Sequence, residues 1–438
     1  MYDKRTKIVA TIGPASEKKE ILSAMIKAGM NVARLNFSHG EHDWHAKTIK
    51  LIRNLSEEVR LPIGIMADLQ GPRIRVGNFE EFAVKNGDII FISDKKTGRS
   101  NELVIDSDGV CSFLKKGERV LIEDGLIEVR VIEKKQTIIK GEVISGGEIK
   151  PRKGINFPDT DLRLDAVTKK DEKDLRFALS HNVDFVALSF VSNAKEIKSL
   201  KNKIRKIMGK SKNLPLVIAK IERKEAIRNI DEIIKAVDGI MVARGDLGIE
   251  MDESRVVLYQ KEIIAKCLRE AKPVIVATQM LDSMIKNPIP TRAEVSDVSN
   301  AVIDHTDAVM LSGESANGKY PVKTMETMSK IIRDTEESPF DDLKHGFLHD
   351  SSYSISTAVA NSTHELAKNS GAKAIVVASL SGFTARMIAR HRPQQKIYVM
   401  TNSQKTYFNL SLLWGTESFI LSDCETLDEL INKSVDIL

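Results

Sequence analysis

The 438 residues of this chain are too many for one hydrophobic core, so we expect two or three domains, with a barrel of roughly 250 residues as the largest. The 66 basic and 61 acidic residues are interspersed and only 5% of residues are aromatic, which disfavours nucleic-acid binding, while a net charge of +5 suits a small anionic substrate. The 3 cysteines lie far apart, and no signal peptide or membrane-spanning run is visible. We therefore expect a cytoplasmic protein that makes no membrane contact.

Eight apolar runs, each ending in polar residues, are the most informative feature of the chain. They are rich in β-branched and aliphatic residues, which is typical of parallel strands buried on both faces. Amphipathic stretches at helical spacing lie between them, so the alternation predicts parallel βαβ units and an α/β fold, a (β/α)8 TIM barrel. The runs are 6–13, 32–38, 63–71, 184–190, 216–222, 239–246, 274–280 and 308–314, and the helical stretches are 16–29, 41–59, 169–182, 193–209, 224–237, 254–271, 292–304 and 321–338.

The alternation stops after the third strand, where short β-type runs are punctuated by glycine-containing turns. This predicts a small inserted β-barrel domain that leaves from a strand end and can lie over the rim as a lid. A linker follows Glu336, and further strands at 374–379, 396–401 and 418–422 alternate with helices in a third α/β domain. The expected division is barrel 1–71, lid 72–159, barrel 160–338 and C-terminal domain 339–438.

Lys220 and Glu222 are two residues apart at the end of one run, so both side chains point to the same face of the strand. Asp246 ends the next run and could join Glu222 as an oxygen ligand of Mg²⁺, which commonly takes one or two protein carboxylates. Gly245 allows backbone N–H groups to approach a ligand closely. A structural ion pair, and an ordinary turn at 244–248, are the alternatives.

Arg34 ends another run, and its guanidinium suits a phosphate or a carboxylate, although a surface ion pair would explain it equally well. Asn36, Ser38 and Asp68 add oxygen atoms that could surround a monovalent cation or an oriented water molecule. Further hydroxyl groups and a carboxylate at strand ends suit proton relay, although such a threonine is usually a turn residue. These residues are Thr278, Ser312 and Glu314.

Three other motifs suggest different chemistry. Residues 313–320 nearly match a phosphate-binding loop, but Tyr320 replaces the metal-binding hydroxyl. Residues 379–384 could form an anion site at a helix start or an ordinary cap. A histidine triplet lacks the partner that a zinc site needs, and comprises His39, His42 and His45.

Together, the spaced motifs closely resemble those of the pyruvate kinase family, from Thr6 to Trp414. The resemblance implies a barrel, an inserted lid, a C-terminal domain and usually a homotetramer. It implies transfer of the phosphoryl group of phosphoenolpyruvate to ADP, giving ATP and pyruvate in the last step of glycolysis. The motifs are RLNFSHG, ADLQGPRIRVG, RKGINFPDTD, LVIAKIERKEA, MVARGDLGIE, ATQMLDSM, PTRAEVSDVSNAV and MLSGESANGKYP.

The resemblance also assigns roles. Lys220 would stabilise charge between donor and acceptor, Arg34 would contact the transferring phosphate, and Glu222 with Asp246 would hold Mg²⁺ or Mn²⁺. The substrate contacts would be Arg34, Lys220, Gly245, Asp246 and Thr278, with Lys220, Arg34 and Thr278 as the catalytic residues. The nucleotide contacts would be Asn36, Phe37, Ser38, His39, Arg75 and Lys153. Phosphoryl transfer asks mainly for positioning and charge neutralisation, which these residue types supply.

Arg73 separates this chain from many relatives, which have Glu there and depend on K⁺, whereas others have Lys and do not. We therefore expect the Arg73 guanidinium to supply the positive charge and added K⁺ to change activity little. The shell that would otherwise hold K⁺ would be empty or water-filled, and comprises Asn36, Ser38, Asp68 and the Leu69 carbonyl.

The C-terminal domain is expected to be short. Relatives usually continue past the Trp414–Gly415 motif through a helix and a strand with a glycine-rich turn, whereas this sequence ends at Leu438. Regulation by a sugar phosphate is therefore doubtful, and the exposed sheet edge would be covered by a partner subunit or be the result of truncation.

Two other functions use part of the same residue set. A Mg²⁺-dependent lyase that forms a pyruvate enolate by C–C cleavage would use Glu222 and Asp246, but would need neither Lys220 nor the lid. A non-catalytic effector-binding protein would be expected to have lost Lys220 or a metal carboxylate. Because the sequence keeps all of them, it favours the kinase.

Overall fold

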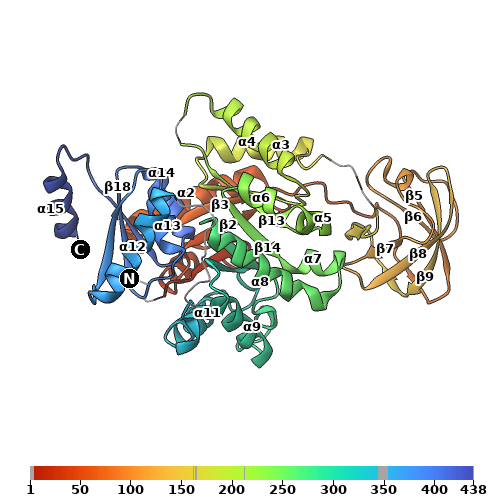
Figure 1. Cartoon of the computed structure of the whole chain (residues 1–438). Helices are drawn as coiled ribbons and strands as arrows, with labels where there is room; N and C mark the ends of the chain where they lie inside the picture. Colours follow the sequence, from red (N-terminus) through yellow and green to blue (C-terminus); the bar gives the residue numbers. More distant parts are fainter. Residues whose placement is uncertain (1–3, 161, 163–164, 212, 344–353, 438) are drawn as a thin grey trace.

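The computed structural model describes residues 4–160, 162, 165–211, 213–343 and 354–437. A central barrel carries a β domain at one end and a smaller α/β domain at the other (Figure 1). The linker expected after Glu336 falls partly at 344–353, outside the described residues. No helix in the described ranges combines the length and apolarity needed to cross a membrane.

The central domain is a closed ring of eight parallel strands, which confirms the predicted TIM barrel. The strands follow one another around the ring in chain order, as right-handed βαβ units require. Each lies within one of the eight predicted runs. They are β1 (Lys7–Thr11), β2 (Val32–Asn36), β3 (Gly64–Asp68), β12 (Phe185–Leu188), β13 (Leu216–Ile221), β14 (Gly239–Ala243), β15 (Val274–Ala277) and β16 (Ala308–Leu311).

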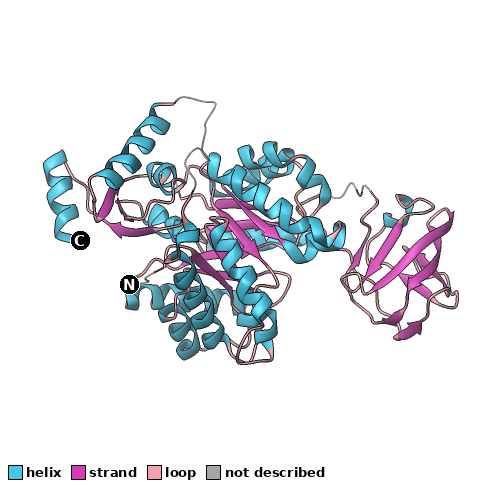
Figure 2. Cartoon of the chain, turned by 60° about the horizontal axis from the view of Figure 1, so that its bottom comes forward, coloured by secondary structure: helices cyan, strands magenta, loops and turns pink. Residues whose placement is uncertain are grey.

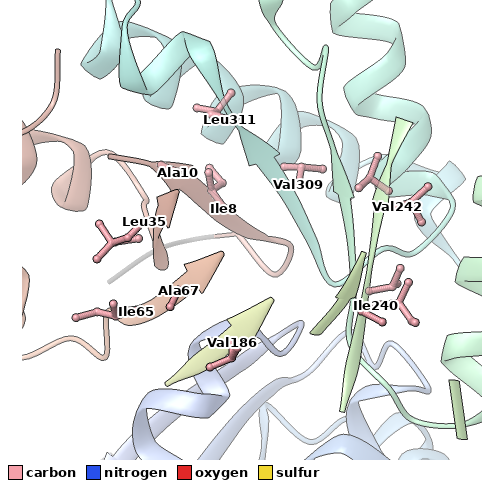
Figure 3. Packing of buried hydrophobic residues seen from close by; sticks show 14 of the residues in the cluster. Ile8, Ala10, Leu35, Ile65, Ala67, Val186, Ile240, Val242, Val309 and Leu311 are labelled. Carbon is pink, nitrogen blue, oxygen red and sulfur yellow. The ribbon is translucent and has the colours of Figure 1, made fainter. Parts of the chain in front are cut away.

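Side chains alternate between the two faces of the ring, and both faces are buried. Val9 belongs to the cluster that fills the barrel interior, whereas its neighbours Ile8 and Ala10 pack outward with the helices. Figure 3 labels members of this outer cluster on strands from the first part of the barrel sequence, such as Ile8, and from the last part, such as Leu311. Leu412, from the C-terminal domain, joins the interior cluster, so this domain closes the amino end of the barrel.

The amino end of the ring is capped in a four-fold pattern. The side chain of the residue before every second strand of the ring accepts an N–H from the first or second residue of the preceding strand. The pairs are Asn31 with Ile8 (3.0 Å), Asp184 with Ile65 (2.8 Å), Asp238 with Val217 (2.9 Å) and Asp307 with Val274 (3.1 Å). Each acceptor also has cationic partners, namely Lys4 for Asn31, Arg53 and Lys405 for Asp184, Lys201 for Asp238 and Arg392 for Asp307. These caps satisfy N–H groups that the parallel ladder leaves open.

Helices cover the outside of the ring (Figure 2). The structure splits the predicted helix 224–237 into two and adds two short helices directly after β14 and β16, at 244–250 and 313–316. The helices are α1 (Lys19–Lys27), α2 (His42–Val59), α3 (Lys169–Ser180), α4 (Ala194–Met208), α5 (Lys224–Arg228), α6 (Ile230–Ala236), α7 (Arg244–Glu250), α8 (Glu253–Arg269), α9 (Arg292–Ile303), α10 (Gly313–Ala316) and α11 (Pro321–Glu336), with 3₁₀ turns η2 (Asp282–Ile285) and η3 (Pro339–Asp341).

The inserted domain has its own hydrophobic core and projects from the carboxyl end of the barrel (Figure 1). A six-stranded sheet has the order β11-β7-β8-β9-β5-β6, and β4 pairs with β10. The elements are β4 (Phe82–Val84), β5 (Ile89–Ser93), β6 (Glu102–Val104), η1 (Val110–Ser112), β7 (Arg119–Ile122), β8 (Ile127–Lys135), β9 (Ile138–Ser145), β10 (Gly147–Ile149) and β11 (Ile155–Asn156).

Two single-residue bridges link the ends of this sheet. Arg75 pairs with Gly154, next to β11, and Val76 pairs with Ile105, next to β6. The expected small barrel is therefore closed by the segment that leaves β3 rather than by a further strand. Because this segment also carries Arg73, the hinge and the wall of the insert are the same piece of chain.

The C-terminal domain is a three-stranded parallel sheet of order β17-β18-β19 with helices. β17 and β18 lie within the predicted runs, and β19 overlaps its predicted run but begins two residues earlier. The elements are α12 (Ile355–Asn369), β17 (Ala374–Ala378), α13 (Phe383–Ala389), β18 (Lys396–Thr401), α14 (Gln404–Asn409), η4 (Leu410–Leu412), β19 (Thr416–Ile420) and α15 (Leu427–Ile437).

Asp238→Ala tests the capping pattern. The substitution leaves the buried N–H of Val217 without its acceptor, so the free energy of unfolding should fall by about 1–3 kcal/mol. Lys201→Met is the matched control, because it removes only the partly exposed ion-pair partner and should change stability by less than about 1 kcal/mol. Denaturant unfolding followed by circular dichroism measures both, and equal losses would contradict a capping role.

Candidate active site

Four of the predicted site residues come together at the carboxyl end of the barrel. Lys220 lies near the end of β13 and Glu222 directly follows that strand. Arg34 lies near the end of β2, and Asp68 is the last residue of β3. Because neighbouring strands are in parallel register, these four side chains share one rim.

Lys220 is at the centre of this rim. Its ammonium lies 2.8 Å from Glu222 Oε1, 2.8 Å from the Ser189 hydroxyl and 3.4 Å from Asp68 Oδ1. The Ser189 hydroxyl donates in turn to the Leu69 carbonyl at 2.8 Å. The ammonium of Lys220 therefore faces three oxygen atoms from three strand ends, which fixes its position.

The charges around Lys220 keep it protonated. Burial by itself would lower the pKa of Lys220, but Asp68 and Glu222 outweigh burial and raise it. Burial raises the pKa of Glu222, an effect that Lys220 opposes and Asp246 reinforces. Burial would also raise the pKa of Asp68, but Lys220 and Arg34 hold it below its usual range. Lys220 is thus a fixed positive charge rather than a proton donor.

Asp68 also anchors Arg34. The Arg34 Nε donates to Asp68 Oδ2 at 2.7 Å, and a terminal nitrogen lies 2.6 Å from the same oxygen. The other terminal nitrogen donates to the Thr11 hydroxyl at 2.8 Å. Arg34 is buried, so the alternative of a surface ion pair does not apply. Two cations share one carboxylate, which leaves this corner able to attract an anion.

Asp246 lies in the first turn of α7, so the segment 244–250 is helical rather than a simple turn. Asp246 contributes to the raised pKa of Glu222, which means that the two carboxylates repel each other. A divalent cation offsets such repulsion, and Mg²⁺ prefers carboxylate oxygens. In the described ranges no three His, Cys, Asp or Glu side chains form a metal-binding group. The pair therefore fits an ion whose remaining ligands are substrate and water.

Thr278 follows β15 and meets the end of β14. Its hydroxyl accepts the N–H of Gly245 at 2.8 Å and donates to the Ala277 carbonyl at 2.6 Å. Its φ of 70° is unusual for a β-branched residue. The Thr278 hydroxyl therefore contacts Gly245, the residue that directly precedes Asp246.

Glu314 has a different environment from the one predicted. It is buried in α10, and its two oxygens accept the backbone N–H groups of Leu281 (3.1 Å) and Ser312 (2.7 Å). Burial raises its pKa. The carboxylate therefore braces the ends of β15 and β16 against each other, while Ser312 remains partly exposed on the rim.

Some of the predicted nucleotide contacts line a cleft between the barrel and the insert. Ser38, His39 and Arg75 belong to its wall. Asn36 lies beside them and accepts the N–H of Ser38 at 3.1 Å. The side chain of Phe37 points elsewhere, because it is buried and stacks on the ring of His45 at 4.2 Å. The other residues of the wall are Gln70, Gly77, Asn78, Asp106 and Arg152.

Two cationic residues of the hinge region pair within the insert. Lys153 lies 2.5 Å from Glu123, and Arg73 lies 3.6 Å from Asp124. Burial and then Arg75, Arg73, Arg34 and Lys170 lower the pKa of His39. The charge of Arg73 therefore reaches the segment 36–39, although no contact of Arg73 with the expected K⁺ shell is recorded among the described residues.

The three other motifs have the following local structures. Residues 313–320 fold into α10 and the turn before α11 rather than an open phosphate loop. His42 pairs with Asp174 at 2.7 Å, and His45 contacts the His39 carbonyl at 3.0 Å. At 379–384, Gly382 (φ 72°) is the residue before α13, and this described helix end has no side-chain cap hydrogen bond.

Sequence reasoning missed three groups of the site. The Thr11 hydroxyl orients Arg34, the Ser189 hydroxyl contacts Lys220, and the Phe190 N–H donates to Glu222 Oε2 at 2.7 Å. Thr11 is the last residue of β1 and Ser189 directly follows β12, so the rule that marked the other site residues also covers them. The Phe190 N–H has no sequence signal, because it depends on a φ of 55°.

Fixed cations beside two close carboxylates on the rim of a TIM barrel suit an enzyme of the phosphoryl-transfer class. Family models match the chain over residues 3–325 (pyruvate kinase, barrel domain) and 357–438 (pyruvate kinase, alpha/beta domain). The chain belongs to the pyruvate kinase family. Its function is the family's reaction, transfer of the phosphoryl group of phosphoenolpyruvate to ADP in glycolysis.

Similar proteins cover nearly the whole chain. The pyruvate kinase of Staphylococcus epidermidis is 40% identical over 441 residues, which span 99% of this chain and 74% of the relative. That of Geobacillus stearothermophilus is 41% identical over 440 residues, with the same coverage of 99% and 74%. The crystal structure of a pyruvate kinase from Cryptosporidium parvum matches with a TM-score of 0.94 at 36% identity, covering 99% of this chain and 90% of the other.

Asp68→Asn tests the charge balance of the rim. The substitution leaves the buried Lys220 and Arg34 without their shared negative charge, so the free energy of unfolding should fall by about 3–5 kcal/mol. Inorganic phosphate should restore part of this loss, and should stabilise the variant more than the wild type.

Asp174→Asn is the matched control. Asp174 is also buried and pairs with two basic side chains, but these, His42 and Lys170, are partly exposed, so the loss should stay near or below about 1 kcal/mol. Thermal unfolding with and without phosphate measures both variants. Equal losses, or no added effect of phosphate, would argue against the shared carboxylate.

Proposed function

We propose that the family reaction takes place on the carboxyl-end rim, with Lys220, Arg34 and Thr278 as the catalytic residues. The observation that carries this proposal is the position of Lys220, a protonated, buried cation directed at the rim by Asp68, Glu222 and Ser189. Arg34 receives the phosphate of phosphoenolpyruvate, and Lys220 neutralises the charge that builds up between donor and acceptor oxygens.

The divalent ion is Mg²⁺ or Mn²⁺, held by Glu222 and Asp246. When bound, it supplies Lewis-acid stabilisation of negative charge on the enolate oxygen. Gly245 leaves room for the substrate carboxylate beside Thr278, whose hydroxyl already lies 2.8 Å from the Gly245 nitrogen. Thr278 and Ser312 form the hydroxyl relay that delivers a proton to the enolate carbon, while Glu314 holds the two strand ends in place.

ADP occupies the cleft between the barrel and the insert. Ser38, His39 and Arg75 line this cleft, and Asn36 orients the segment that carries two of them. Phe37 contributes through its backbone, since its ring is packed in the core. Lys153 reaches the nucleotide by exchanging its pairing with Glu123 when the insert closes over the rim.

Lys220→Met tests the central assignment. Wild-type protein should form pyruvate from phosphoenolpyruvate only when ADP and Mg²⁺ or Mn²⁺ are present, measured by coupling to lactate dehydrogenase. Lys220→Met should lower kcat by about 10²–10³-fold or more, because it removes a fixed charge from the transition state. Lys201→Met, which removes a lysine at the opposite end of the barrel, should keep kcat unchanged. No turnover by the wild type, or full turnover by Lys220→Met, would refute the assignment.

Arg73 makes the enzyme independent of K⁺. Its charge acts on the segment 36–39, as the lowered pKa of His39 indicates, with burial the largest cause. Two oxygens of the K⁺ shell already have protein partners, because Asp68 pairs with Arg34 and the Leu69 carbonyl accepts from Ser189.

Replacing tetramethylammonium chloride by potassium chloride at equal ionic strength should therefore change kcat little. Arg73→Glu should create dependence on K⁺, because it replaces a positive charge by a negative one at this edge. Arg130→Glu is the control, since it makes the same charge change on the exposed surface of the insert. Large K⁺ activation of the wild type at saturating Mg²⁺ would contradict the proposal.

We also propose a homotetramer in the cytoplasm, with domains at 1–71, 72–159, 160–338 and 339–438. The separate hydrophobic clusters of the barrel, insert and C-terminal part support the division. Exposed apolar residues of α12, such as Ile355 and Leu366, support association between copies. The cysteines Cys111, Cys267 and Cys424 are all free, which suits a reducing compartment.

A further inference from the structure

Arg244 is next in sequence to residues of the proposed site, but its side chain lies between helices outside the site. It directly precedes Gly245 and Asp246, yet it is buried among α7, α8 and α9. Its two terminal nitrogens lie 2.7 Å from the two oxygens of Asp297 on α9. This two-point pairing fixes the plane of the guanidinium.

The same guanidinium holds the turn that follows β15. One terminal nitrogen donates to the Thr278 carbonyl at 2.8 Å and lies 3.4 Å from the Gln279 carbonyl. Thr278 and Gln279 both have left-handed backbone conformations, with φ of 70° and 54°. Such conformations are strained for residues other than glycine and persist only where surrounding contacts impose them.

Two consecutive residues thus hold Thr278, one at its side chain and the other at its carbonyl. The Gly245 N–H donates to its side-chain oxygen, and Arg244 donates to its carbonyl. Because Gly245 and Asp246 follow Arg244 directly, the same anchor also ties the carboxylate segment to the hydroxyl. Any movement of the guanidinium would move the Thr278 hydroxyl relative to Asp246.

We propose that Arg244, anchored by Asp297, is a positioning residue that sets the Thr278 hydroxyl for the reaction. This inference rests on the proposed role of Thr278. Arginine is required because a planar fork can pair with a carboxylate at two points and still reach carbonyl oxygens, whereas a lysine presents one compact charge. Arg244 itself does not touch the substrate.

The test is a double-mutant cycle on the full-length enzyme with Arg244→Lys, Thr278→Ala and their combination. Arg244→Lys should lower kcat by about 10- to 100-fold, since misplacing a reacting group by a fraction of an ångström to an ångström has effects of this size. The KM for ADP should not change. Exchange of the pyruvate methyl protons with deuterium oxide, followed by NMR, should slow by the same factor, because it uses the same hydroxyl.

The cycle separates positioning from a general structural effect. If Arg244 acts through Thr278, adding Arg244→Lys to Thr278→Ala should change kcat by less than about two-fold. Asp297→Asn should resemble Arg244→Lys in direction, with a smaller loss. The matched control is Arg53→Lys at the opposite end of the barrel, where Arg53 also bridges a carboxylate, Asp184 (2.8 Å), and the carbonyls of Asn182 (2.9 Å) and Ile63 (3.2 Å). It should lower the melting temperature without lowering kcat.

The outcomes distinguish failure of the proposed role of Thr278 from failure of the positioning role of Arg244. Full activity of Thr278→Ala would overturn the proposed role of Thr278 and leave Arg244 nothing to position. An impaired Thr278→Ala whose effect multiplies with that of Arg244→Lys would overturn the positioning role alone. Wild-type kcat in Arg244→Lys, or an equal loss of kcat in Arg53→Lys, would also overturn it.

Discussion

The parallel hydrogen bonds that close eight strands into one ring decide where polar groups can lie in this protein. Both faces of every strand are buried, one against the interior cluster and one against the helices. Charged groups therefore gather at the two ends of the ring, where side chains from different strands meet. At the amino end they cap open N–H groups and attach the C-terminal domain, and at the carboxyl end they form the proposed site. Stability and chemistry are thus separated along the barrel axis.

The carboxyl end balances its charges with few groups. Asp68 lies between Lys220 and Arg34, so each cation is held in place while the trio keeps a net positive charge. Glu222, in contrast to Asp68, is buried beside another carboxylate, Asp246, as well as beside Lys220. Its pKa is raised, with burial as the largest cause. Buried charges interact more strongly than exposed ones, because water screens them less. The arrangement therefore favours an incoming phosphate on one side and a divalent cation on the other.

The fold and most of the site could be predicted because strand ends are visible in the sequence. The eight runs contain the eight strands, and the polar residues that end them include Arg34, Lys220 and Thr278. Two side chains lie in environments that the sequence did not indicate. Phe37 is buried in the core and Glu314 accepts backbone N–H groups, and neither outcome can be read from a local pattern. The helix at 244–250 was missed because a short segment with two glycines has weak helix propensity, and packing overrides it.

The sequence by itself determined the class of fold, the side of the barrel that carries chemistry and the family, since these depend on alternation along the chain and on residue identity at strand ends. Only the tertiary structure decided which groups touch. The pairing of Arg34 with Asp68, of Lys220 with Ser189 and of Arg244 with Thr278 joins different strand ends. Such contacts depend on the register of neighbouring strands and on closure of the ring. Register and closure arise from long-range packing, which a local period of two residues does not encode.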